Sequence, residues 1–140
     1  MFLLDTNVVS ELRKAKRGRA DTNVVVWTAN TPTRDTFISA VTILELEMGV
    51  LIVGRRDPQQ GRVLRRWMED QVVAVFEDRI LAVDEAVARR AAALHVPDPR
   101  PDRDTLIAAT ALVHGMTVVT RNIGDFAPTG VSLLDPWRPA

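Results

Sequence analysis

Short apolar runs alternate with longer amphipathic stretches along the chain. Five runs of apolar and β-branched residues, each followed at once by polar residues, predict strands at 2–4, 36–40, 80–84, 117–120 and 131–134. Helices are predicted between them, at 8–15, 22–30, 42–53, 58–76, 85–95 and 104–115. Alternating strands and helices predict an α/β fold: a central parallel sheet of about five strands with helices on both faces.

The remaining segments are short. Residues 98–104 (DPRPDRD) are predicted to form a proline-rich loop, and residues 135–140 (DPWRPA) a frayed end. No repeat, low-complexity segment or linker interrupts the chain, and 140 residues are enough to bury a core without disulfides or metals. We therefore expect a single domain over residues 1–140.

Composition excludes several classes of protein. The chain has no cysteine, which rules out disulfides, a thiolate nucleophile and a cysteine-ligated zinc site. Its two histidines, His95 and His114, are too far apart for an HExxH zinc motif. No basic segment precedes the first apolar residues, and no apolar run approaches the length of a membrane span. These features predict a cytoplasmic protein.

Acidic and amide residues follow several of the predicted strands. Asp5 comes directly after the first strand, Glu45 lies one turn into the helix after the second, and Asp104 opens the helix at 104–115. Asn122 and Asp125 follow the strand at 117–120. Parallel strands end at the same edge of a sheet, so these side chains are expected to converge there. Clustered carboxylates repel one another unless a cation neutralises them, and oxygen ligands suit Mg²⁺ or Mn²⁺.

Each of these acids also has a local explanation. Asp5 and Asp104 can cap the helices that follow them. Thr42 and Glu45 fit a capping box, and Asp125 can be a turn residue. These explanations are independent of one another, whereas one shared metal site explains all four acids together.

Other chemistries that use an aspartate after a buried strand are disfavoured. Phosphoaspartyl enzymes and receiver modules need a lysine late in the chain, but Lys14 and Lys16 are the only lysines here. A dehalogenase-like DxD motif is missing because position 7 is Asn7. Phosphate-binding glycine loops and a GxSxG nucleophile elbow are also absent from the sequence.

The positive charges are clustered although the net charge is zero. Residues 13–19 (RKAKRGR) hold five cations, and a second cluster lies within residues 55–66. The first run also fits ordinary helix C-terminus chemistry, with cations in the last turn and Gly18 as the stop. That explanation is compatible with phosphate contacts. A neutral chain otherwise has no strong overall attraction for nucleic acid.

Four segments resemble the PIN-domain ribonucleases, in particular the VapC-like toxins of bacterial type II toxin–antitoxin pairs, including the FitB-like branch. They are LLDTNVVSE at the N-terminus, ISAVTILELEMG around Glu45, DTLIAATAL from Asp104, and VVTRNIGDF at 118–126; the closing LLDPW is also similar. All four occur in order, and the resemblance covers nearly the whole chain. It implies a single PIN domain with a PIN-like fold.

The resemblance also implies an activity and a site. The activity is Mg²⁺-dependent hydrolysis of RNA phosphodiester bonds, with Mn²⁺ as a possible substitute. Asp5, Glu45 and Asp104 match the family's best-kept acids, and Asp5 and Asp104 are the expected direct metal ligands. Some relatives have an acid at the position of Asn122. Because this chain has an asparagine there, Asp125, the nearest carboxylate, is expected to be the fourth catalytic acid.

Supporting residues and partners follow from the same resemblance. Thr6, Asn7, Thr120 and Asn122 are expected to orient the carboxylates or metal-bound water. The clustered cations, rather than the resemblance, give the expected RNA contacts: Arg13, Lys14, Lys16, Arg17 and Arg19, with Arg121, which can either steer phosphate or simply extend over the sheet edge.

The implied partners are an RNA substrate, a cognate VapB-like antitoxin and a second copy of the chain, in a homodimer that joins a larger assembly with the antitoxin. Residues 62–76, with Trp67 and Met68, are candidates for these contacts or for ordinary core packing. The alternative function is a PIN protein that acts mainly in a DNA-binding regulatory complex and cleaves little. DNA is also open as the substrate.

Overall fold

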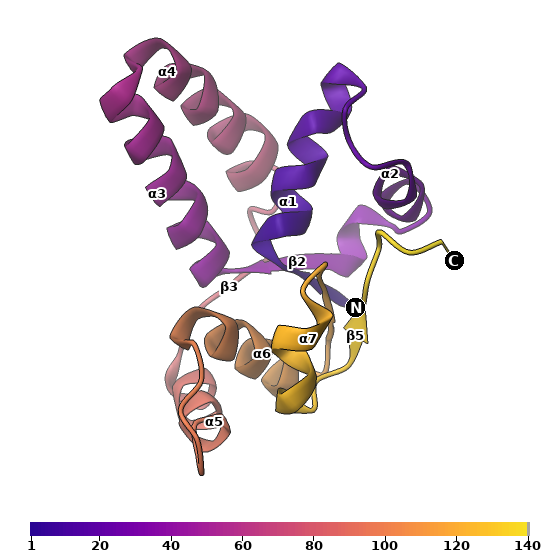
Figure 1. Cartoon of the computed structure of the whole chain (residues 1–140), viewed down its shortest axis with the longest axis vertical. Coiled ribbons are helices and arrows are strands. Elements are labelled where there is room, and N and C mark those ends of the chain that lie inside the picture. The colour runs from indigo at the N-terminus through magenta and orange to yellow at the C-terminus, as the bar shows by residue number, and fades with distance from the viewer. Residues whose placement is uncertain (140) are drawn as a thin grey trace.

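The computed structural model describes residues 1–139 and contains one five-stranded parallel sheet, in the order β3-β2-β1-β4-β5 (Figure 1). This α/β architecture confirms the prediction of a parallel sheet of about five strands with helices on both faces. The strands are β1 (Phe2–Leu4), β2 (Thr36–Ser39), β3 (Ile80–Leu81), β4 (Thr117–Val119) and β5 (Leu133–Leu134). The helices are α1 (Thr6–Arg13), η1 (Lys14–Arg17), α2 (Thr22–Ala29), η2 (Thr33–Asp35), α3 (Ala40–Arg56), α4 (Pro58–Trp67), η3 (Met68–Val73), α5 (Glu85–Leu94), α6 (Asp102–His114), α7 (Ile123–Phe126) and η4 (Ala127–Thr129).

Alternate residues of the central strand supply the two cores. Leu4 packs on one face with Ile38 of β2, against residues of α1, α3 and η3. Leu3 packs on the other face with Val118 of β4, against the alanine-rich side of α6. Figure 1 accordingly shows α1, α3 and α4 on one side of the sheet and α5 and α6 on the other. Burial on both faces explains why the strands are continuously apolar rather than alternating.

The α3–α4 hairpin projects from the sheet beside α1 (Figure 1). Asp57 ends α3 and caps α4, because its carboxylate accepts the backbone N–H groups of residues 59 and 60, and Pro58 occupies the first turn. The two helices approach so closely that a Cβ on Gly61 would lie 2.4 Å from the Cα of Gly54. Glycine is therefore required at position 61 for this hairpin to close.

Several predicted elements differ from the structure. The predicted loop at 98–104 is wrong at its end, because α6 already begins at Asp102. The helix predicted at 58–76 is α-helical only to Trp67 and continues as the π-helical turn η3. The short helix α7 was not predicted. The predicted strand at 80–84 shrinks to two residues.

The end of the chain is docked, which contradicts the predicted frayed end for the described residues 135–139. Trp137 packs against the core beside α1 and α2, and its carbonyl oxygen accepts a hydrogen bond of 2.7 Å from the Asn23 side chain. Residue 140 lies outside the described residues. Nowhere in residues 1–139 does a helix combine the length and the apolar character needed to cross a membrane.

Candidate active site

A cavity of about 470 Å³ opens at the edge of the sheet where β1 and β4 end. It lies between α1, the first turns of α3 and α6, and the segment after β4. Its lining residues are Asp5, Thr6, Asn7, Ser10, Glu11, Lys14, Glu45, Asp104, Arg121, Asn122 and Trp137. The structure thus brings together three of the four predicted acids from segments that are far apart in the sequence.

Asp5 is the most buried of these acids, at 5% exposure. Its carboxylate accepts the Thr6 backbone N–H at 2.8 Å and the Thr120 hydroxyl at 2.7 Å, with the Asn7 side-chain amide at 3.3 Å. Asp5 is also the N-cap of α1, so the capping explanation is correct and compatible with a place in the site.

Burial raises the pKa of Asp5 above its ordinary value of 3.8, and the charges of Asp104 and Glu45 raise it further. The hydrogen bonds from Thr120 and Thr6 lower this pKa, but they do not cancel the effect of burial. Asp5 therefore holds its negative charge in an unfavourable place, which a bound cation would relieve.

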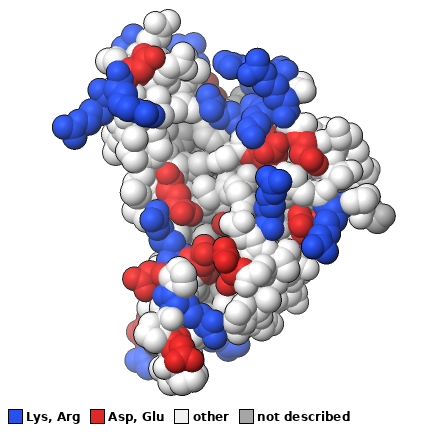
Figure 2. Space-filling view, viewed as in Figure 1, with Lys and Arg blue, Asp and Glu red and all other residues white. Residues whose placement is uncertain are grey.

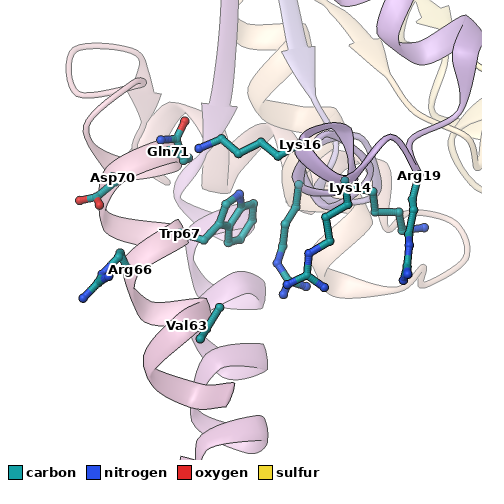
Figure 3. A pocket seen from close by; sticks show the side chains of 10 residues that line it. Lys14, Lys16, Arg19, Val63, Arg66, Trp67, Asp70 and Gln71 are labelled. Atoms are coloured by element: carbon teal, nitrogen blue, oxygen red, sulfur yellow. The ribbon is translucent and has the colours of Figure 1, made fainter. Parts of the chain in front are cut away.

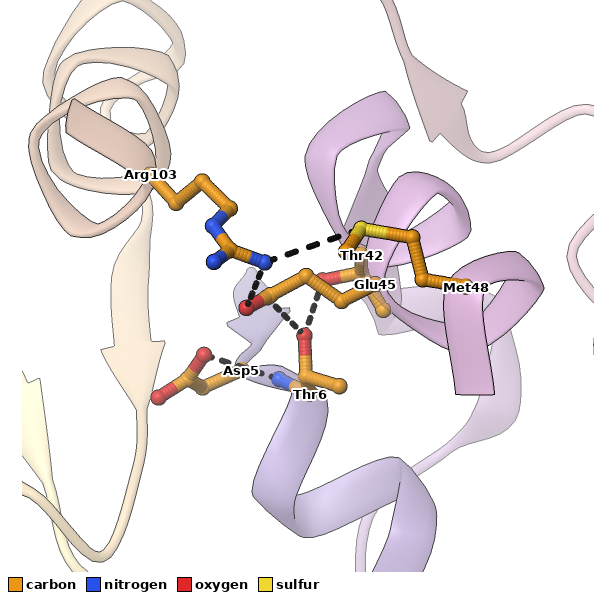
Figure 4. Close-up of polar contacts among 6 residues, drawn as sticks. All are labelled: Asp5, Thr6, Thr42, Glu45, Met48 and Arg103. Carbon is orange, nitrogen blue, oxygen red and sulfur yellow. Dashed lines mark hydrogen bonds and ion pairs between the residues drawn. The ribbon is translucent and has the colours of Figure 1, made fainter. Parts of the chain in front are cut away.

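Glu45 faces Asp5 from α3 (Figure 4). The Thr6 hydroxyl donates to Oε1 of Glu45 at 2.7 Å and lies 3.1 Å from the Thr42 hydroxyl. On the other side, the Arg103 guanidinium lies 3.6 Å from Oε2 of Glu45. The same Arg103 nitrogen is 3.9 Å from the sulfur of Met48.

The capping-box explanation for Glu45 is wrong. Helix α3 begins two residues before Thr42, and its N-cap is Ser39, whose hydroxyl accepts the Val41 N–H at 2.9 Å. Glu45 therefore lies too far along the helix to cap its first turn, and its carboxylate is held by Thr6 of α1 instead.

Asp104 lies in the first turn of α6, two residues after its start, so the N-cap explanation for this acid is also wrong. Burial raises the pKa of Asp104, and the charges of Asp125 and Glu45 raise it further, while Arg103 lowers it. The neighbouring acid Asp102 is instead 89% exposed, with an oxygen 3.5 Å from the His95 ring.

Asn122 and Asp125 are the two candidates for the fourth residue of the site, and the structure places them differently. Asn122 lines the cavity, and its backbone N–H donates to the Thr120 hydroxyl at 3.0 Å. Asp125 is exposed on α7 and acts on the site through its charge, which raises the pKa of Asp104. The geometry thus gives Asn122 direct access to a cavity ligand and gives Asp125 an indirect electrostatic effect.

The predicted cations separate into two groups. Lys14 and Arg121 line this cavity, and the Arg121 guanidinium lies 5.3 Å from the centre of the Trp137 ring. The others, together with Lys14, line a second cavity between α1–η1 and α4: Arg13, Lys16, Arg17 and Arg19. The run at 13–19 also has the predicted helix-stop chemistry, because Gly18 adopts φ 65° after η1.

Sequence reasoning missed several residues at the cavity. Arg103 was assigned to a loop, and Trp137 to a frayed end, although both contribute to the site. Ser10 and Glu11 line the cavity beyond Asn7. Glu11 accepts the Asp21 backbone N–H at 2.8 Å and pairs with Lys14 at 3.1 Å, and these contacts lower its pKa. A carboxylate placed one helical turn after Asn7 was the available signal for Glu11.

The donor set fits a divalent cation held by two carboxylates. Within the part of the chain that the structure describes, no three acidic or histidine side chains are arranged to hold a metal by themselves. Magnesium is commonly bound through one or two carboxylates and retains several waters. Asp5 and Asp104 supply that number, and burial together with neighbouring carboxylates raises the pKa of each, an effect that a bound cation would oppose.

Comparison with known proteins gives the same family by three routes. The PIN domain family model matches residues 2–128. The toxin FitB of Neisseria gonorrhoeae is 36% identical over 144 residues, covering 99% of each chain, and the VapC ribonuclease Y4jK of Sinorhizobium fredii is 33% identical over the full length of both chains. The crystal structure of FitAcB from Neisseria gonorrhoeae matches with a TM-score of 0.88 at 34% identity, covering 99% of each chain.

Proposed function

The chain belongs to the PIN domain family, and from this premise we propose that it is a ribonuclease toxin of the VapC type, neutralised by a cognate antitoxin. We further propose that it hydrolyses RNA phosphodiester bonds with Mg²⁺, or with Mn²⁺ in its place. The observation that supports this most directly is the convergence of Asp5, Glu45 and Asp104 on one cavity at the end of the sheet.

The reaction needs no nucleophile from the protein. Asp5 and Asp104 would hold the ion, which when bound acidifies a water and neutralises charge on the phosphate. Thr120 and Asn7 fix the orientation of the Asp5 carboxylate. This arrangement makes Asp5 a rigid ligand rather than a mobile one.

The remaining polar side chains hold charge near the place where a phosphate would sit. Thr6 fixes Glu45, whose second oxygen faces Arg103. Lys14 and Arg121 at the cavity lining offer positive charge to the phosphates of the substrate. Asn122 offers an amide oxygen to water in the cavity, and Asp125 acts as a more distant acid.

The alternative, a regulatory protein that cleaves little, is less well supported. Relatives that match over the full length are named as a ribonuclease and a toxin. A protein that only binds partners would also have no use for carboxylates that repel one another and whose charged forms are destabilised by burial. A role in DNA-bound regulation remains compatible with cleavage, since one matching structure, 34% identical, is FitAB bound to a DNA fragment.

We propose two protein partners, an antitoxin and a second copy of the chain. Exposed apolar residues form a stripe along α3, at the spacing of one helix face: Leu44, Met48, Leu51 and Ile52, each 41–58% exposed. This stripe suits a homodimer contact better than the predicted segment 62–76. In that segment Met68 is only 2% exposed and belongs to the core, so the core-packing explanation is correct for it.

The test of the activity uses the purified full chain and single-stranded RNA labelled at either end. We expect cleavage with Mg²⁺ that stops in EDTA and leaves 5′-phosphate and 3′-hydroxyl ends. Single-stranded DNA of the same sequence is the matched substrate and decides between RNA and DNA. Cleavage that continues in EDTA, or that favours DNA, would contradict the proposal.

A further inference from the structure

A second cavity of about 440 Å³ lies between α1–η1 and the end of α4 (Figure 3). We call it the basic groove. Six of its ten lining residues are cations and one is an acid, Asp70. The cations are Arg13, Lys14, Lys16, Arg17, Arg19 and Arg66. Figure 3 shows Trp67 projecting from α4 toward α1–η1, with Lys16 reaching across toward Gln71.

The charge of this groove is largely unneutralised. Across residues 1–139, Lys14 is the one groove cation with an ion-pair partner, Glu11 at 3.1 Å. Figure 2 shows cations gathered on the upper parts of the molecule on both sides of the central hollow, with acidic side chains nearer its base. Cations held together in a concave surface raise the local concentration of anionic ligands.

Trp67 gives the groove a second recognition element. The ring is half-buried and packs against the core, and the Arg13 guanidinium lies over it, 5.9 Å from its centre. A planar aromatic face beside several free cations is the arrangement with which proteins hold single-stranded nucleic acid, because bases stack on the ring while phosphates pair with the cations.

The basic groove also connects with the acidic cavity. Lys14, the first residue of η1, lines both cavities. The two cavities therefore adjoin at Lys14, and a strand held at the acidic cavity lies next to the groove cations that are unpaired within residues 1–139.

We propose that the basic groove is a binding subsite for single-stranded RNA, in which one base stacks on Trp67 while Arg13, Lys16 and Arg17 contact the adjacent phosphates. This inference rests on the proposed ribonuclease function and extends it, because it gives the substrate a second point of attachment away from the bond that is cut. RNA suits the groove better than an acidic protein segment, since a nucleobase can stack on the Trp67 ring whereas a carboxylate has no aromatic surface.

The test measures binding in EDTA, so that it does not depend on cleavage. The probe is a fluorescent 12-nucleotide single-stranded RNA, and a matched strand is abasic at all internal positions. Replacing Trp67 by Leu (Trp67→Leu) removes the aromatic face and keeps an apolar side chain. We expect it to weaken binding of the normal strand about tenfold, the usual effect of losing one stacked base, and to leave the abasic strand nearly unaffected.

Two further variants keep the test decisive if Trp67→Leu folds poorly. Trp67→Tyr retains an aromatic face and should recover most of the affinity. Arg17→Gln changes an exposed side chain and should weaken both strands, whereas Arg90→Gln, an exposed side chain on α5 across the sheet, is the matched control and should weaken neither.

The outcomes separate this inference from the proposed function. If Trp67→Leu and Arg17→Gln bind both strands like the unaltered protein while Mg²⁺-dependent cleavage is present, the subsite is refuted and the ribonuclease stands. An equal loss for normal and abasic strands in Trp67→Leu would refute base stacking. Groove-dependent binding without any cleavage would support the subsite and refute the ribonuclease.

Discussion

The acidic cavity and the basic groove adjoin one another and are built in opposite ways. Carboxylates of the cavity come from three distant segments, which meet only because β2, β1 and β4 are neighbours in the sheet. Most cations of the groove come from one continuous run, residues 13–19, and are exposed. The cavity thus depends on the whole fold, whereas the groove depends mainly on local sequence.

The difference has an energetic side. Placing Asp5 and Asp104 together opposes folding, because burial and mutual repulsion disfavour their charged forms. Exposed cations remain solvated and add little strain. Unfavourable charge is therefore concentrated where a metal would relieve it, as expected for a site in which stability is exchanged for function.

The largest effect is expected in the acidic cavity, when one acid on α6 is replaced by its amide. Asp104→Asn should lower Mg²⁺-dependent RNA cleavage roughly 10³-fold, because the loss of a ligand that positions the ion removes several kcal/mol of transition-state stabilisation. The measurement is the initial rate on end-labelled RNA. Asp102→Asn, the same change two residues away on an 89% exposed side chain, is the matched control and should keep nearly full activity. Equal losses in both variants would remove Asp104 from the site.

A second test separates the acid from the group that orients it. Thr120→Val removes the hydroxyl that donates to Asp5 at 2.7 Å and should weaken Mg²⁺ affinity about 10–100-fold. The pKa of Asp5 should rise further, since this hydrogen bond lowers it, and the acid limb of the pH–rate profile should move to higher pH. Mg²⁺ titrations of activity at several pH values measure both effects. Thr120→Ser retains a hydroxyl and should restore them; a serine variant as weak as the valine one would argue against the hydrogen bond.

A third test concerns stability without metal. The pKa of Asp5 is raised in the folded protein, so above pH 3.8 the folded state keeps a proton that the unfolded chain has released. The free energy of unfolding therefore falls as the pH rises above 3.8 and Asp5 has to become charged in the folded state. In EDTA at pH 7, Asp5→Asn should therefore be more stable than the unaltered chain by on the order of 1 kcal/mol, about 3 °C in Tm. The gap should close as the pH falls toward 3.8. Denaturant unfolding at pH 4 and pH 7 measures it, and a variant less stable at pH 7 would contradict the strained-charge account.

The sequence was most informative where local and long-range signals agree. Continuous apolar runs predicted all five strands, and acids placed after β1, after β2 and in the first turn of α6 predicted the residues that now share a cavity. Parallel strand order supplies the reason, since every strand end lies on the same edge. The geometry could not have been predicted for a residue such as Asp125, because one helical turn decides whether a side chain faces the cavity or solvent.

The missed features depend on tertiary contacts. Arg103 lies in a proline-rich, charged segment with no apolar periodicity, so nothing local shows that α6 starts at Asp102. Trp137 follows a proline near the end of the chain, and its packing against the core and its hydrogen bond with Asn23 of α2 hold it. Residues 68–73 have ordinary helical composition, so nothing local predicts their π-helical geometry, and Met68 and Val72 within them are buried in the core.

The smallest expected effects test whether the acidic cavity lowers RNA affinity in the absence of metal while the basic groove raises it. In EDTA, Arg19→Gln should reduce the slope of log affinity against log salt by about 0.7, the value for one lost phosphate contact on a single strand. Asp104→Asn should instead bind RNA a few-fold more tightly, because it removes a negative charge that repels phosphate when no metal is bound. Fluorescence anisotropy with the 12-nucleotide RNA at four salt concentrations measures both changes. If both variants weakened binding, the carboxylates would be contributing to RNA affinity directly, and the division between a cleaving cavity and a holding groove would fail.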